Sequence, residues 1–158
     1  MKYLLIALSV FIPFKHVQAE SLHMQFLSKT NIPGMSIEGR LSESIKMKES
    51  EFEIPIKKMK TGMDSRDEHM YEEIFKNKNI RLSIVNFKEC IGKESCAAEV
   101  NLEITGFKKK LTIPVRQKED VKLANFTVKL TDFQIHPPEK FGVQVEDQVE
   151  VRIEVTKD

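Results

Sequence analysis

The sequence lacks a strong excess of charge of either sign. Its 158 residues hold 25 Lys and Arg against 24 Asp and Glu, which gives a formal net charge of +1. A nucleic-acid-binding surface usually shows as a clear basic excess, so nucleic acid is not an expected partner. Glycine and proline are scarce, with six of each, and 41% of the residues are hydrophobic. This composition excludes a disordered or collagen-like chain and predicts one core.

Signatures of catalysis and of metal binding are also missing. The sequence has no nucleophile elbow, phosphate-binding glycine loop, His-Glu-x-x-His motif or EF-hand spacing. The histidines His23, His69 and His136 lie on separate segments, so a metal site is not expected. An enzymatic hypothesis would pair His69 with Asp67 as a general base, but residues two apart on a helix do not face each other. We therefore expect a protein that is not an enzyme, with no catalytic residue and no cofactor.

The only long hydrophobic run lies at the N-terminus. Met1 and Lys2 supply a short positive end, residues 3–14 are mostly apolar, and small residues occupy positions 17 and 19. This pattern predicts a secretory signal peptide, residues 1–19, cleaved after Ala19. The run is shorter than the roughly 20 residues of a membrane-spanning helix. We expect an exported domain at residues 20–158 without stable membrane insertion; an uncleaved anchor is the alternative interpretation.

Cysteine is limited to Cys90 and Cys96. An oxidising compartment allows two such residues to pair. The segment between them contains Gly92 and lies between two strand-like runs, so a hairpin loop would bring its ends close together. We predict a Cys90–Cys96 disulfide. The absence of a Cys-x-x-Cys spacing argues against zinc binding or thioredoxin-type redox chemistry.

The dominant pattern of the remaining chain is alternation of apolar and polar residues. It predicts about eight antiparallel strands, two of which, at residues 35–47 and 143–155, exceed the usual strand length. Long amphipathic strands suggest a curved sheet, and closure into an eight-stranded antiparallel up-and-down barrel removes exposed edges. A β-sandwich is the alternative. Regular alternation would turn Asp147 toward the apolar face, so we expect a β-bulge or bend near Glu146 and Asp147.

Residues 61–75 interrupt the alternation. Asp64 is placed to cap a helix, and Met63, Met70 and Ile74 recur on one side at helical spacing. We predict a short amphipathic helix across one end of the barrel. Its polar groups have two interpretations: a solvated, capped helix start, or side chains at the barrel mouth that hydrogen-bond the polar end of an apolar ligand.

Several segments together resemble the YceI-like proteins. They are Thr61-Gly62 followed by Arg66-Asp67-x-His69-Met70, Ile104-Thr105-Gly106-Phe107-Lys108 with Leu111-Thr112-Ile113-Pro114-Val115, and Asp132-Phe133-x-Ile135 with Gly142-Val143-x-Val145-x-Asp147-x-Val149. The resemblance implies a lipocalin-like eight-stranded barrel with a helix. It also implies a bound long apolar chain, such as a polyisoprenoid or an isoprenoid quinone, export to the bacterial periplasm and a link to stress responses.

The leading hypothesis is a periplasmic carrier or scavenger of an amphiphilic lipid. We expect ligand contacts from the helix and from the apolar strand faces, namely Arg66, Asp67, His69, Met70, Ile37, Ile54, Leu82, Val100, Leu102, Phe126, Val128, Val149 and Val151. The alternative is a barrel filled by Phe52, Phe87, Phe107, Phe126 and Phe133, which acts as an envelope adaptor through its outer surface. The sequence leaves protein partners and a homodimer open.

Overall fold

Strands dominate the computed structural model, which describes residues 20–86 and 92–157. The mainly β fold class expected from the alternation is therefore confirmed. The strands are β1 (Glu20–Thr30), β2 (Ser36–Leu41), β3 (Ile45–Lys46), β4 (Glu51–Ile54), β5 (Met59–Lys60), β6 (Ile80–Ile84), β7 (Ser95–Ile104), β8 (Phe107–Lys118), β9 (Val121–Lys129), β10 (Glu139–Lys140) and β11 (Val143–Lys157). The helical turns are η1 (Ile56–Lys58), α1 (Asp64–His69), η2 (Met70–Ile74) and η4 (Leu130–Phe133).

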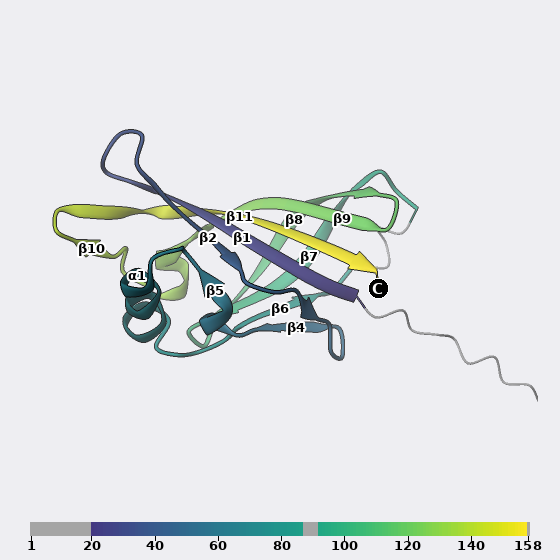
Figure 1. The fold of residues 1–158 in the computed structure, drawn as a ribbon. Helices are drawn as coiled ribbons and strands as arrows, with labels where there is room; N and C mark the ends of the chain where they lie inside the picture. Colours follow the sequence, from purple (N-terminus) through teal and green to yellow (C-terminus); the bar gives the residue numbers. More distant parts are fainter. Residues whose placement is uncertain (1–19, 87–91, 158) are drawn as a thin grey trace, which may run out of the picture.

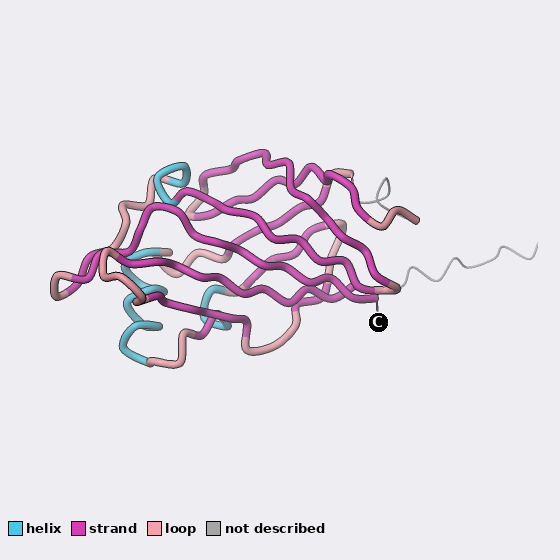
Figure 2. The backbone as a smooth tube through the Cα atoms, turned by 90° about the horizontal axis from the view of Figure 1, so that it is seen from above, coloured by secondary structure: helices cyan, strands magenta, loops and turns pink. Residues whose placement is uncertain are grey.

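One antiparallel sheet contains all of these strands. Its order is β4-β6-β7-β8-β9-β11-β1-β2-β5, with β3 added to β1 and β10 added to β11. Figure 1 shows β1 and β11 side by side along the molecule, and Figure 2 shows the sheet curling, with the helical turns toward the end away from the C-terminus. The described strands number 11 rather than eight. The sheet is a half-barrel whose edges, β4 and β5, are joined through η1 and not by a hydrogen-bonded ladder.

The long strand expected at residues 35–47 is divided into β2 and β3. Both segments pair with β1, but the register moves from Gln25 opposite Arg40 to Leu22 opposite Ile45. The chain between β2 and β3 therefore carries two more residues than the facing part of β1. Within this extra stretch, the Ser42 amide donates to the Lys58 carbonyl, 2.8 Å away. Alternation could not show the interruption, because Ile45 resumes on the buried face that Leu41 left.

The long strand expected at residues 143–155 is confirmed as β11. Its pairing with β1 shifts register between Ser28, opposite Val149, and Thr30, opposite Val145. This shift confirms the irregularity predicted near Glu146 and Asp147. The Asp147 carboxylate accepts hydrogen bonds from the Thr131 amide (2.9 Å) and hydroxyl (2.8 Å). These bonds, the backbone bond first, hold the pKa of Asp147 below its usual 3.8.

The predicted helix forms as α1 and continues as η2, a π-helical turn in which the Phe75 amide donates to the Met70 carbonyl. Asp64 does not cap it: Met63 occupies the N-cap position, and no side chain caps the helix there. The acidic residue that holds the helix start in place is Asp67. Its carboxylate accepts hydrogen bonds from the backbone N–H (2.8 Å) and the hydroxyl (2.7 Å) of Thr61. This buried contact fixes the helix against the segment that follows β5.

The half of the sheet near the chain termini is closely packed. Inward side chains from β6 to β9 and from β11 leave a gap of only ≈10 Å³ between Ile84, Ala98, Val100, Ile113, Val115, Lys122, Ala124, Ile153 and Val155. A buried ion pair joins the strands at this end, with Lys122 Nζ 3.2 Å from Glu20 Oε1. This half supplies the solid part of the core.

Candidate functional site

The other half of the half-barrel contains a cavity of ≈370 Å³. Its walls are the inner face of the sheet, α1 with η2, and the β10–β11 hairpin. The volume lies within the range of roughly 300–1,000 Å³ typical of ligand pockets. Almost all of its lining is apolar, so the cavity favours a hydrophobic guest over a polar metabolite.

The sheet wall consists of inward side chains from separate strands. The apolar lining residues of β1, β2, β7, β9 and β11 are Met24, Phe26, Ile37, Leu102, Ile104, Phe126, Val128, Val143, Val145, Val149 and Val151, and Ser28 of β1 also lines the cavity. A glycine shapes one part of this wall. An added Cβ at Gly39 would lie 2.1 Å from Cε1 of Phe26, so the missing side chain of Gly39 provides the space that the Phe26 ring occupies.

The helical wall brings a few polar groups to the cavity. Met70 and Ile74 supply apolar contacts, whereas Arg66 and His69 line the same space with half-buried side chains. His69 Nδ1 lies 3.1 Å from the carboxylate of Glu73, one helical turn further on. Within the described part of the chain, no carboxylate lies within ion-pair distance of Arg66. A guanidinium beside an apolar cavity can bind the polar or anionic end of an amphiphile.

Most of the sequence-predicted ligand contacts meet at this cavity. They are Arg66, His69, Met70, Ile37, Leu102, Phe126, Val128, Val149 and Val151. Asp67 does not reach the cavity, because its carboxylate is buried against Thr61. Ile54, Leu82 and Val100 face the sheet interior but lie in the solid core, each 0% exposed. Alternation identifies the inward face of a strand but not the position along the barrel at which that face becomes hollow.

Several lining residues were missed by the sequence reasoning. Met24, Phe26 and Ile104 belong to inward faces, and Met59 and Phe75 flank the helical segment. The first three share the parity of neighbouring buried residues, so alternation contained the signal. The positions of the last two depend on how β5 and η2 pack, which the pattern does not encode.

The phenylalanines proposed to fill the barrel occupy different environments. Phe52 and Phe133 are buried at 0% and 1% exposure and fill core space. Phe126 lines the cavity, and Phe107 is 39% exposed on the surface. Phe87, Cys90 and residues 1–19 lie outside the described residues, so the signal peptide and the Cys90–Cys96 disulfide stay predictions.

Membrane-spanning helices and metal-binding clusters are both absent from the described residues. No helix there is both long and apolar enough to cross a membrane. The same residues contain no group of three or more His, Cys, Asp or Glu side chains arranged to hold a metal ion.

Comparison with known proteins identifies the class defined by this curled sheet, helix and cavity. The sequence profile of the YceI-like domain matches residues 14–157, so the chain belongs to the YceI-like family. This confirms the resemblance found from the motifs. No curated protein matches the chain.

Solved structures share the fold at low sequence identity. A polyisoprenoid binding domain from Saccharophagus degradans, implicated in plant cell wall breakdown, superposes with a TM-score of 0.65 at 13% identity, over 89% of this chain and 99% of its own. BcnA from Burkholderia cenocepacia gives a TM-score of 0.63 at 15% identity, over 87% and 96%. The YceI protein of Campylobacter jejuni gives 0.54 at 17% identity, over 84% and 81%.

Proposed function

We propose that this protein binds a long apolar amphiphile, of the polyisoprenoid or isoprenoid quinone type, in the cavity beside α1. It acts as a carrier or scavenger and catalyses no reaction. The observation that carries the proposal is the ≈370 Å³ cavity with its apolar wall. The similarity to a polyisoprenoid binding domain supports the same class of ligand.

The affinity of such a complex would come mainly from hydrophobic burial. Each methylene group moved from water into the cavity contributes about 0.8 kcal/mol. The wall is already formed, so the protein pays little to organise the site. Arg66 and His69 then orient the ligand by binding its polar end near the helix.

We also propose that the protein works in the periplasm after removal of residues 1–19. The apolar N-terminal run and the small residues at positions 17 and 19 support export. In that oxidising compartment Cys90 would form a disulfide with Cys96 of β7.

Native mass spectrometry of the mature protein, expressed with its own signal, tests the function. The expected result is a mass excess that disappears under denaturing conditions, together with a long-chain lipid in the organic extract. A bare processed chain in repeated preparations, with no lipid taken up from added polyisoprenoid or quinone, would contradict the proposal. That result would favour the adaptor role.

A substitution in the wall links the lipid to this cavity. Val151→Phe adds a ring to an inward position of β11, and we expect it to lower the bound lipid content several-fold by filling the space. Thr127→Phe is the matched control, because it adds the same ring to an exposed position on the neighbouring strand β9. Equal lipid content in the two variants would show that the lipid is bound elsewhere.

A further inference from the structure

The tip of the β10–β11 hairpin carries an unusual residue. Lys140 pairs with Val143, so Phe141 and Gly142 form a two-residue turn, with φ of 54° and 76°. Positive φ at both positions is typical of a type I′ turn, for which Asn-Gly is strongly preferred. A bulky aromatic residue in this region is a conformational outlier. Phe141 is nevertheless 95% exposed, so burial does not offset the strain.

Comparable tight turns in the described chain place polar residues at this position. The left-handed residues of the turns after Lys48, after β7 and after β8 are Glu49, Thr105 and Glu119. Thr105 uses its hydroxyl to donate to the Phe133 carbonyl, 3.0 Å away. Phe141 is thus the exception among these turns, which points to a role outside the folded chain.

The hairpin tip is hydrogen-bonded to the β1–β2 loop. Asn31 bridges the two segments with three hydrogen bonds. Its backbone N–H donates to the Gln144 carbonyl (2.9 Å), and its side-chain NH₂ donates to the Gly142 carbonyl (3.1 Å). Its side-chain oxygen accepts from the backbone N–H of Gln144 (2.9 Å). Figure 1 shows this loop and this hairpin projecting at the end where α1 lies. These three hydrogen bonds join the two projections.

Exposed apolar side chains gather at this end of the molecule. We define the mouth tip as Ile32 (41% exposed), Met35 (40%), Met63 (51%) and Phe141 (95%). The tip borders the cavity, since Met35, Met63 and Phe141 also line it. Together these side chains expose roughly 400–500 Å² of apolar surface, given about 200 Å² for one Phe. A standard protein interface needs about 800 Å² from each partner, so the tip is too small to support a stable dimer.

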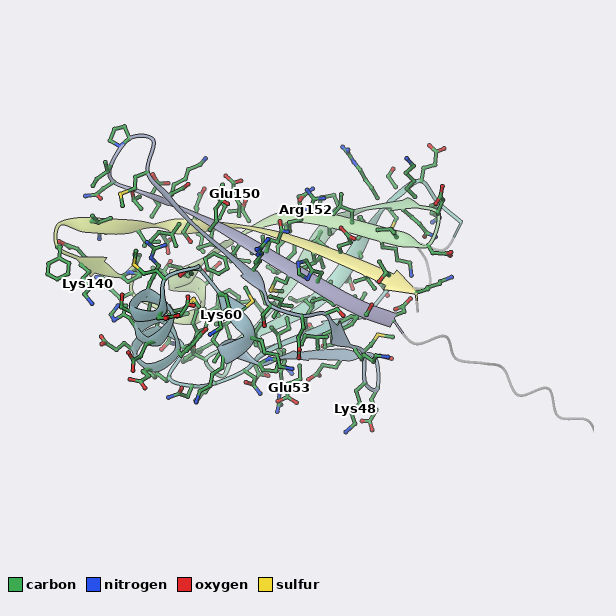
Figure 3. The ribbon with its side chains drawn as sticks, in the orientation of Figure 1. Lys48, Glu53, Lys60, Lys140, Glu150 and Arg152 are labelled. Atoms are coloured by element: carbon green, nitrogen blue, oxygen red, sulfur yellow. The ribbon has the colours of Figure 1, made fainter. Side chains whose placement is uncertain are left out.

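Exposed charges of both signs, Asp64, Glu139 and Lys140, flank the mouth tip on its helix and hairpin sides, whereas its β1–β2 side has none. The β1–β2 loop from Thr30 to Ile37 has no charged side chain, so apolar insertion there requires no charge to be buried. Lys140 lies directly behind Phe141, with its Nζ 5.7 Å from the ring centroid. Figure 3 shows Lys140 at the far end of the hairpin. Proteins at membrane interfaces commonly place an aromatic ring at the boundary of the acyl chains and a lysine ammonium at the level of the phosphates.

From this geometry we infer that the mouth tip inserts its apolar side chains into the interfacial region of a phospholipid bilayer. The cavity would then open directly onto the membrane that supplies or receives the lipid. This inference rests on the proposed function, because contact with a membrane would serve a protein that binds lipid. The contact is shallow and reversible, because a few side chains anchor much less firmly than a membrane-spanning helix.

The test is flotation of the purified mature protein with vesicles of phosphatidylcholine and phosphatidylglycerol. Phe141→Asn is the central variant, because it removes the ring while creating the Asn-Gly pair that this turn prefers. We expect an unchanged or higher thermal midpoint and vesicle binding weaker by about tenfold or more. Val85→Asn is the matched control: Val85 is 52% exposed, follows β6 away from the cavity, and should bind vesicles like wild type.

The outcomes test membrane docking separately from lipid binding in the cavity. Equal vesicle binding by Phe141→Asn and wild type overturns it, as does wild type that fails to bind vesicles. A wild-type dimer that Phe141→Asn converts to monomer also overturns it, and assigns the tip to a second copy. Lipid content of the wild-type cavity is measured in parallel. Cavity lipid without vesicle binding therefore refutes only the docking, and vesicle binding without cavity lipid refutes only the proposed function.

Discussion

The contact between Gly39 and Phe26 allows a sharp test of how the cavity wall is built. A Cβ at position 39 would lie 2.1, 2.3 and 3.0 Å from Cε1, Cζ and Cδ1 of the Phe26 ring. Real carbon contacts are near 3.5–4.0 Å. Gly39→Ala therefore pushes the ring away by roughly 1.5 Å. Because Phe26 lines the cavity, the ring moves into the space proposed for the ligand.

The size of the effect follows from two opposing contributions. Overpacking a well-packed site costs about 1–3 kcal/mol. Replacing a strand glycine with alanine recovers roughly 0.5–1 kcal/mol. We expect Gly39→Ala to lower the free energy of unfolding by about 1–2 kcal/mol. With Phe26→Ala present the clash is gone, so the same change should stabilise the protein by roughly 0.5–1 kcal/mol.

A double-mutant cycle measured by urea unfolding checks this reasoning. The four proteins are wild type, the two single variants and the double variant, and the expected coupling between positions 39 and 26 is about 1–3 kcal/mol. Bound lipid, measured by denaturing mass spectrometry, should fall in Gly39→Ala alone. An equal effect of Gly39→Ala in both backgrounds would refute the steric argument.

Three further outcomes are expected elsewhere in the fold. Lys122→Met leaves the buried Glu20 carboxylate without the ammonium beside it and should lower the free energy of unfolding in urea by about 3–5 kcal/mol. Adding Glu20→Gln should recover part of that loss. No recovery would argue against the ion pair. Asp147→Ala should cost about 1 kcal/mol at neutral pH. Because the folded pKa of Asp147 is lowered, this difference is fully present above 3.8 and should disappear as the pH falls through the folded pKa; a difference independent of pH would contradict it. Intact-mass measurement after alkylation without reductant should show no modified Cys90 or Cys96 in exported protein, and two alkylated thiols would end the disulfide prediction.

The sequence predicted the faces of the strands better than their depth in the barrel. Alternation placed Val100 and Val151 on inward faces, and both are inward, because strand geometry alone decides that. Val100 lies in solid core and Val151 borders the cavity, because this difference depends on which side chains meet across the sheet. An unpaired carboxylate in a regular strand gave a physical reason to expect the irregularity at Asp147.

The helix shows where local patterns stop being sufficient. Helical spacing located the segment, and α1 with η2 confirms it. Asp64 looked like the cap, whereas the carboxylate that fixes the helix is Asp67, bound to Thr61. The π-helical turn is equally invisible to spacing, because it follows from tertiary packing. Tyr71, at this turn, donates from its hydroxyl to the Met59 carbonyl, 2.6 Å away, and so anchors the segment to β5.

The solid core and the proposed ligand site lie in different halves of the half-barrel. A cavity removes packing contacts from the side chains around it, so a small domain with one hollow half must obtain its stability from the other half. The nearly void-free core around Val100 and the buried Lys122–Glu20 pair lie in that solid half. The cavity wall is therefore free to vary in side-chain size, within the limits set by contacts such as Gly39 against Phe26. Changes in the width of the proposed ligand site should then leave this core intact.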